Sequence, residues 1–354
     1  ADDFYRGETA ALIVQQMEKS NGLISLEDLD AYAAVWRAPV RAGWRDYEII
    51  SAPPPSSGGF AIVQLLKMKD YLSELFEGVE HNSAQYIHLV AEMEKRVFAD
   101  RAEYLGDPDF FDIDIDALID DDYLARRAAE VNPKAISVLD SINPGLESPN
   151  TTHYSIVDQW GNAVSNTYTI NWDYGSGVVV GGAGFLLNNE MDDFSAKPGT
   201  PNIYGVVGSV ANEIQPGKRM LSSMSPTIVL KDGEVEMVLG TPGGSTIFTT
   251  VFQVITNIVD FGMSVEEAIG IARFHHQLVP PDLITYSGFT IDQHLPKVTV
   301  GDLSEKGYRS EPHSFEYGDV QIIVRSGDSW IAASDPRDRG QSRVFEVTTK
   351  TRDR

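Results

Sequence analysis

"SPNTTHYSIVDQWGNAVSNTYTIN", residues 148–171, has the pattern of a β-hairpin. Runs of β-branched and aromatic residues lie on both sides of residues 158–162, which have the composition of a turn. The first strand is therefore expected to begin at Thr151 or Thr152. Such a placement is ordinary for a structural strand. Cleavage before a threonine would, however, also leave a free α-amine beside its hydroxyl, which makes a nucleophile with its own base.

The composition restricts the classes of function. The chain has 354 residues, of which 42% are hydrophobic, so it is long enough for a substantial core. It has no cysteine, which excludes disulfides, thiol catalysis and thiolate metal sites. The formal charge of -24 disfavours binding to nucleic acids and anionic membranes. Neither a membrane span nor a signal peptide is visible, because the longest apolar stretch, residues 247–261, contains Thr, Gln, Asn and Asp.

The chain changes character near residue 150. Residues 1–150 read mainly as helices, with long helical patterns at 60–72 and 83–105. Short strands with glycine turns dominate the rest of the chain, and helices return at 245–260 and 264–274. This order predicts an α+β fold in which packed sheets are covered by helices.

Gly243 and Gly244 lie between an expected strand and an expected helix, in the sequence "GTPGGS". The first turn of a helix has free N–H groups and a positive dipole potential, and glycines let an anion approach those amides closely. An oxyanion hole for acyl transfer would use this geometry. A tight strand-to-helix turn is the structural alternative.

Two further stretches have polar groups suited to binding a zwitterion. "LLNNEMDDFSAKPG" contains Glu190 and Asp193, whose carboxylates could hold a substrate ammonium or form a capped acidic turn. "KRMLSSMSPTIVL" contains Ser222 and Ser223, whose hydroxyls could bind a carboxylate or cap backbone groups.

Other charged or imidazole side chains are expected to have structural roles. His275 and His276 are adjacent and would face different directions on a helix, so we expect helix-end or capping histidines. Asp335 and Arg337 are expected to form an ion pair or a turn. The acidic stretch 107–123 lacks the glycine and terminal glutamate of an EF-hand loop and indicates a solvated surface. No metal or cofactor site is expected.

Several long motifs, in this order, resemble the gamma-glutamyltranspeptidase (gamma-glutamyltransferase) family: "NTTHYSIVD", "NTYTIN", "GFLLNNEMDDFSAKPG", "SSMSPTIVLKDG" and "GTPGGS". Before residue 150, "GLISLEDLDAY", "APPPSSGG" and "DRAEYLGDPDF" are similar to the later part of that family's large subunit. The resemblance implies an N-terminal nucleophile hydrolase with an αββα four-layer core. It also implies a precursor that cuts itself between Asn150 and Thr151, so that residues 1–150 would belong to the large subunit and residues 151–354 would form the small, catalytic subunit.

The resemblance also implies roles for single residues. Thr151 would be the nucleophile, and Thr169 would orient its hydroxyl. The remaining implied positions are Asn171, Glu190 and Asp193 at the substrate α-amino group, Ser222 and Ser223 at its α-carboxylate, and Gly243 and Gly244 as oxyanion-hole amides. Residues 198–209 would correspond to a lid loop that some members possess.

The implied reaction is γ-glutamyl transfer or hydrolysis on glutathione and related γ-glutamyl amides, through a γ-glutamyl-Thr151 acyl-enzyme. Water, an amino acid or a peptide would accept the acyl group. Implied partners are the earlier part of the large subunit, which in the family supplies an arginine for the α-carboxylate, and a processed large/small subunit heterodimer. The implied location is periplasmic or secreted.

Three alternatives stay open from sequence. Within the family, the chain could be an acylase for glutaryl or cephalosporin-type amides, or an enzyme that processes poly-γ-glutamate. Glu190 and Asp193 argue against the acylase, because a glutaryl group has no α-ammonium to bind. From another class, it could be an inert, unprocessed fragment or scaffold.

Overall fold

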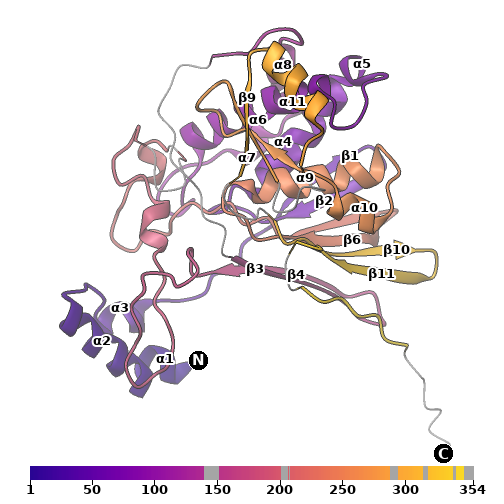
Figure 1. Ribbon diagram of the computed structural model, residues 1–354. Helices are drawn as coiled ribbons and strands as arrows, with labels where there is room; N and C mark the ends of the chain where they lie inside the picture. Colours follow the sequence, from indigo (N-terminus) through magenta and orange to yellow (C-terminus); the bar gives the residue numbers. More distant parts are fainter. Residues whose placement is uncertain are drawn as a thin grey trace, which may run out of the picture.

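The computed structural model describes residues 1–138, 151–200, 206, 208–287, 294–313, 318–337 and 340–346. A six-stranded antiparallel sheet forms its centre (Figure 1). In spatial order the strands are β1 (Val40–Trp44), β2 (Tyr47–Ser51), β5 (Thr227–Lys231), β6 (Glu234–Gly240), β10 (Gln321–Ser326) and β11 (Ser329–Ser334). Because β2 pairs with β5, residues from both sides of segment 139–150 build one sheet.

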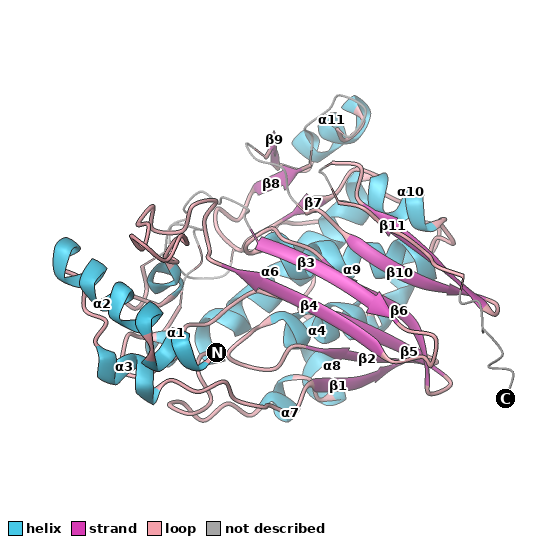
Figure 2. Cartoon of the chain, turned by 90° about the horizontal axis from the view of Figure 1, so that it is seen from below, coloured by secondary structure: helices cyan, strands magenta, loops and turns pink. Residues whose placement is uncertain are grey.

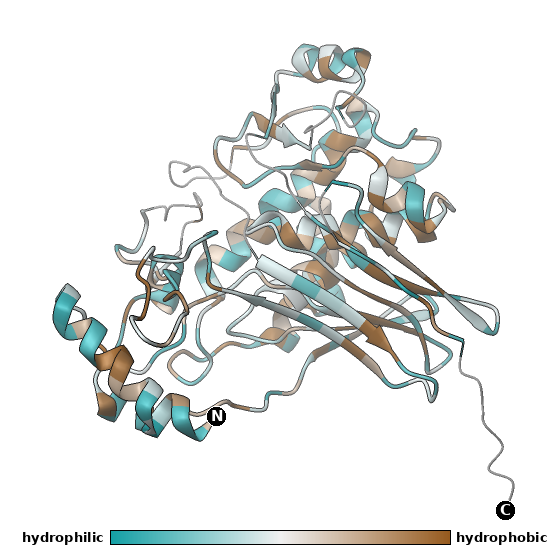
Figure 3. Cartoon of the chain, turned by 60° about the horizontal axis from the view of Figure 1, so that its bottom comes forward, coloured by the Kyte–Doolittle hydropathy of each residue, from teal (hydrophilic) through white to brown (hydrophobic). Residues whose placement is uncertain are grey.

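Helices cover one face of this sheet, and their hydrophobic residues gather toward it (Figure 3). The covering helices are α4 (Gly58–Tyr71), α6 (Ala84–Tyr104), α7 (Ile115–Leu118), α8 (Asp121–Ala129), α9 (Thr246–Val259) and α10 (Val265–Gly270), with the short α5 (Ser73–Phe76) at the end of α4. The helices predicted at 60–72, 83–105 and 245–260 are confirmed. The helix predicted at 264–274 is wrong in its second half: Ile271 is already extended, and Phe274 lies in β7 (Phe274–His275).

The opposite face of the sheet is covered by the predicted hairpin, β3 (Thr151–Val157) and β4 (Ala163–Thr169) (Figure 2). Most of its inner side chains are polar, and the apolar pair Val157 and Ala163 lies at the turn end. The Ser165 hydroxyl donates to the Leu239 carbonyl at 3.0 Å, and the Ser155 hydroxyl donates to the Gln321 carbonyl at 3.3 Å. These bonds fasten the hairpin to β6 and β10 and so fix the position of its first residue, Thr151.

The α+β fold is confirmed. Of the four expected layers, the described residues build a helical layer, a complete sheet and the hairpin of the second sheet. The outer face of that hairpin exposes Tyr154, Ile156, Val164 and Tyr168, and Figure 2 shows no described helix over it. The boundary predicted at residue 150 lies outside the described residues.

Two smaller units complete the fold. Helices α1 (Asp2–Arg6), α2 (Glu8–Ser20) and α3 (Leu26–Ala31) form the first, in which α2 and α3 pack on residues 180–187 in a separate apolar cluster. The second unit contains β7, β8 (Leu283–Tyr286), β9 (Arg309–Pro312) and α11 (Lys297–Glu305). Short 3₁₀ turns occupy Glu190–Asp193 and Val210–Asn212. Within the described part of the chain, no helix has both the length and the apolar character that a membrane crossing requires.

Close packing between the hairpin and the sheet predicts the effect of a single methyl group. A Cβ at Gly240 would overlap the buried imidazole of His153, whereas a Cβ at Gly43 in β1 would meet no atom within 4 Å. We expect Gly240→Ala to lower the free energy of unfolding by about 3 kcal/mol, as overpacking does. Gly43→Ala should change it by less than about 0.5 kcal/mol. Urea unfolding measures both, and equal effects of the two substitutions would contradict the packing described for His153.

Candidate active site

The end of the hairpin brings two threonine hydroxyls together. Thr151 and Thr169 are paired across β3 and β4, and Thr151 Oγ1 donates a hydrogen bond of 3.2 Å to Thr169 Oγ1. Thr169 Oγ1 also accepts a bond of 2.7 Å from the backbone N–H of Asn171. Asn171 is buried and has a φ of 74°, a left-handed conformation that asparagine tolerates better than most residues. The Thr151 hydroxyl is therefore held by a partner that is itself fixed.

The glycine pair adopts the strand-to-helix turn that the sequence predicts. Gly243 and Gly244 have φ values of 138° and 56°, which suit glycine, and they immediately precede Ser245 and helix α9. Neither glycine N–H donates a hydrogen bond to any described residue. The turn therefore presents two unused amides at the positive end of a 14-residue helix, an arrangement that can bind an anion.

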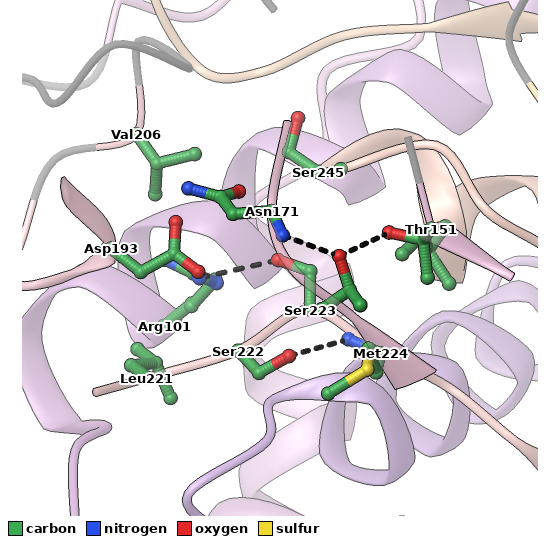
Figure 4. A pocket seen from close by; sticks show the side chains of 13 residues that line it. Arg101, Thr151, Asn171, Asp193, Val206, Leu221, Ser222, Ser223, Met224 and Ser245 are labelled. Carbon is green, nitrogen blue, oxygen red and sulfur yellow. Dashed lines mark hydrogen bonds between the residues drawn. The ribbon is translucent and has the colours of Figure 1, made fainter. Parts of the chain in front are cut away.

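Both features border one pocket that opens to solvent (Figure 4). Its described lining residues are Arg101, Thr151, Thr169, Asn171, Asp193, Val206, Leu221, Ser222, Ser223, Met224, Gly244, Ser245 and Ile247. Seven of the nine predicted site residues are in this set. The other two are Gly243, which precedes Gly244, and Glu190, which is buried and is not among the lining residues. Val206 is the only lining residue from the predicted lid loop, of which residues 201–205 and 207 lie outside the described chain.

Two carboxyl groups meet at one side of the pocket. Glu190 and Asp193, at the ends of a 3₁₀ turn, are hydrogen-bonded to each other, and Glu190 Oε1 is buried with no partner among the described residues. Burial raises the pKa of Glu190 to about 7. Desolvation and the charge of Glu190 raise the pKa of Asp193 well above its ordinary value, although the nearby Arg101 opposes this. The pair therefore holds a proton near neutral pH and would accept a cationic ligand in its place.

The serine pair is held by the loop "PPPSSGG". Ser222 N donates to Pro55 O at 2.7 Å, and Ser57 N donates to Ser222 O at 2.9 Å. Gly58 lets the loop approach, because a Cβ there would overlap the Met224 carbonyl. One wall of the pocket is thus formed jointly by residues from both sides of segment 139–150.

Arg101, Ser57 and Asn212 were not identified from the sequence. Arg101 lines the pocket, but a basic residue in the last turn of a helix is common and gave no signal of a site. Asn212 Nδ2 donates a hydrogen bond of 2.7 Å to Asp193 O, and Asn212 Oδ1 accepts one of 3.0 Å from Leu221 N. Asn212 therefore joins the carboxyl side of the pocket to the serine side. A short polar residue in a loop cannot be assigned such a role from sequence.

The other polar candidates lie outside the pocket. The expectation of helix-end histidines is wrong: His275 and His276 are buried at and beside β7, where neither caps a helix. His276 N donates to the buried Glu94 at 2.7 Å. The ion pair of Asp335 and Arg337 is confirmed at 2.9 Å, and Arg273 joins it at 2.6 Å. No group of three or more potential metal ligands occurs among the described residues.

Comparisons with known proteins identify relatives over nearly the whole chain. The sequence profile described as Gamma-glutamyltranspeptidase matches residues 1–345. A glutathione hydrolase proenzyme of Pseudomonas aeruginosa is 57% identical over 345 residues, which are 98% of this chain and 61% of the relative. The Escherichia coli proenzyme is 46% identical over 340 residues, 95% of this chain and 57% of the relative. The chain thus spans about six-tenths of the length of these relatives.

Solved structures of similar proteins agree with these sequence comparisons. A chain of the gamma-glutamyltranspeptidase from Pseudomonas nitroreducens complexed with L-DON is 57% identical, aligns over its whole length with 55% of this chain, and has a TM-score of 0.53. The cephalosporin acylase from Bacillus halodurans is 24% identical over 98% of this chain and 60% of its own, with a TM-score of 0.77. This second likeness shows the shared fold alone.

The carboxyl pair predicts a pH-dependent stability. The ordinary pKa of Glu190 is 4.5 and its folded value is about 7, so between these values the unfolded chain releases a proton that the folded chain retains. The stabilising effect of this protonation is complete below about pH 4.5 and is lost as the pH rises to about 7. Relative to Glu190→Gln, the free energy of unfolding of the unsubstituted chain should fall by on the order of 3 kcal/mol as the pH rises across this window. Urea unfolding at several pH values measures this, and parallel pH profiles would show that Glu190 is not responsible.

Proposed function

The chain belongs to the gamma-glutamyltranspeptidase family, and from this premise we propose that it transfers γ-glutamyl groups from glutathione and related γ-glutamyl amides to water or to an amine. The observation that carries the proposal is the position of Thr151. It begins a strand, its hydroxyl is held by Thr169, and it borders the same pocket as Gly244 and Asp193.

Thr151 becomes a competent nucleophile when the peptide bond between Asn150 and Thr151 is broken. Before cleavage the nitrogen of Thr151 is an amide and cannot accept a proton. Afterwards it is an amine, which takes the hydroxyl proton directly or through one water. Thr169 keeps the hydroxyl in one orientation throughout, because its own oxygen is anchored by the N–H of Asn171.

The acyl transfer then proceeds in two halves. Thr151 Oγ1 attacks the γ-carbonyl carbon, and the amides of Gly243 and Gly244 stabilise the negative charge on the carbonyl oxygen. The intermediate collapses, the amine product leaves with the proton from the Thr151 amine, and a γ-glutamyl ester remains. Water or an acceptor amine attacks this ester and releases glutamate or a new γ-glutamyl compound.

The charges of the pocket support a substrate that has an α-ammonium group. In this proposal Asn171, Glu190 and Asp193 bind the α-ammonium, and Ser222 and Ser223 bind the α-carboxylate. An ammonium would replace the proton that the two carboxyls hold, which favours a γ-glutamyl group over a glutaryl group.

The same proposal implies a processed heterodimer. Strands from both sides of segment 139–150 build one sheet, so the two products of cleavage would stay together through the pairing of β2 with β5 and through their shared core. We further propose that this enzyme works in the periplasm or outside the cell, on the basis of family resemblance.

The first test is the cleavage itself. Mass spectrometry of the purified chain after incubation should find a fragment that begins at Thr151. Thr151→Ala should remain a single chain because it lacks the attacking oxygen, whereas Thr151→Ser should still be cut because serine retains one. An intact unsubstituted chain would support the inert alternative, and cleavage of the alanine variant would exclude the Thr151 hydroxyl as the agent.

The second test is the choice of substrate. We expect faster turnover of γ-glutamyl-p-nitroanilide than of glutaryl-p-nitroanilide. Asp193→Asn should lower kcat/KM for the first by about 100-fold, the usual effect of removing one partner of a buried charge pair, and should leave the second nearly unchanged. Asp192→Asn, next to it but outside the pocket lining, is the matched control and should alter neither. A preference for the glutaryl compound would favour the acylase alternative.

A further inference from the structure

The hydroxyl groups of Ser222 and Ser223 are both engaged as acceptors. Ser222 Oγ accepts a hydrogen bond of 3.1 Å from Met224 N, and Ser223 Oγ accepts one of 3.2 Å from Arg101 Nη2 (Figure 4). Neither hydroxyl donates to any described residue. Since a hydroxyl has one hydrogen and two lone pairs, a donor on the lone-pair side leaves the hydrogen available to a ligand. The two serines therefore offer two O–H donors to the pocket that they line.

Arg101 is itself held firmly. It lies in the last turn of α6 and is 5% exposed. Its Nε donates to Ser57 Oγ at 3.0 Å, and the Ser57 hydroxyl donates in turn to Ser222 O at 2.9 Å. The planar guanidinium is thus fixed between the "PPPSSGG" loop and the serine pair. A lysine could not reproduce this arrangement, because its ammonium is a single point charge without the guanidinium fork.

The charge of Arg101 also distinguishes it from the rest of the pocket. Among the described lining residues, Arg101 is the only cation and Asp193 the only anion, and Arg101 acts on the carboxyl of Asp193 strongly enough to oppose the rise of its pKa. Figure 4 shows the two side chains next to each other. One positive and one negative group at one end of a pocket complement the ammonium and carboxylate of an α-amino acid.

We propose that Arg101 is a positioning residue for the α-carboxylate of the ligand: it holds the Ser223 hydroxyl as a donor and places a positive charge on the serine side of the pocket. A hydroxyl that accepts a bond from a cation is polarised and donates more strongly to an anion. The inference rests on the proposed function, which assigns the α-carboxylate to the serine pair, and it adds Arg101 as the residue that orients one of these serines. It assigns recognition of the α-carboxylate in part to a residue of this chain.

Binding of two matched ligands tests the assignment. L-Glutamate and L-isoglutamine have the same size and the same α-ammonium, but isoglutamine has a neutral α-amide in place of the α-carboxylate. Isothermal titration calorimetry on the full chain should show that Arg101→Met weakens glutamate binding by about 100-fold and isoglutamine binding by less than about 3-fold. Arg101→Lys should restore only part of the preference for glutamate.

Two further variants separate positioning from general structural support. Arg127→Met removes an arginine of α8 whose 2.6 Å ion pair with Asp100 of α6 lies outside the pocket, and it should leave the ratio of the two affinities unchanged. Ser223→Ala should show the same loss of preference as Arg101→Met, and the double variant should lose little more, because the arginine acts through that hydroxyl.

The outcomes are distinct. A selective loss of glutamate binding in Arg101→Met supports the inference. Equal loss of both ligands, no loss, or additive effects of the two pocket substitutions would overturn it, as would an unsubstituted chain that binds neither ligand. If Arg101→Met does not fold, Ser57→Ala removes the acceptor of Arg101 Nε, together with the bond that Ser57 Oγ donates to Ser222 O, and must shift the ratio in the same direction. Cleavage before Thr151, read separately by mass spectrometry, reports on the proposed function whatever the binding result.

Discussion

The pairing of β2 with β5 is the constraint on which the pocket depends. Ser51 lies opposite Thr227 at the end of this antiparallel ladder, so the chain that leaves β2 and the chain that enters β5 run past the same edge of the sheet. That geometry places the "PPPSSGG" loop against Ser222 and Ser223 and starts α4 beside them. Strand pairing alone thus brings together two polar segments that are about 165 residues apart in sequence.

The pocket concentrates charge in a protein whose surface is strongly acidic. Excess negative charge on the exterior is solvated at little cost, but Glu190 is shielded from water and holds its proton up to about pH 7. This desolvation costs stability in the empty protein and favours any ligand that brings a positive group. The positive charge of Arg101 reduces the cost of desolvating the Asp193 carboxylate. The positive and negative charges of the site are therefore close to balanced before a ligand binds.

Local patterns predicted the parts of the site that depend on neighbours in sequence. The strand beginning at Thr151 follows from β-branched residues next to a turn, and the glycine pair follows from a strand and a helix that are separated by the turn residues 241–245. Arg101 and Asn212 could not be found this way, because their roles arise only when α6 and the 3₁₀ turns meet Ser223 and Asp193. The histidine error has the same origin: the helical pattern continues to residue 274, but the helix ends at Gly270, and His275 is buried in a strand.

In the proposed reaction, this architecture separates the placing of the nucleophile from its activation. The Thr151 hydroxyl is positioned by a cross-strand bond to Thr169 and by a hairpin fastened to β6 and β10, none of which involves the peptide bond before Thr151. Breaking that bond therefore needs no rearrangement of the pocket and adds only the missing proton acceptor. A precursor built this way can keep its glycine amides and charged groups in place from folding onward, because one covalent change controls whether the hydroxyl has an amine to accept its proton when it attacks a substrate.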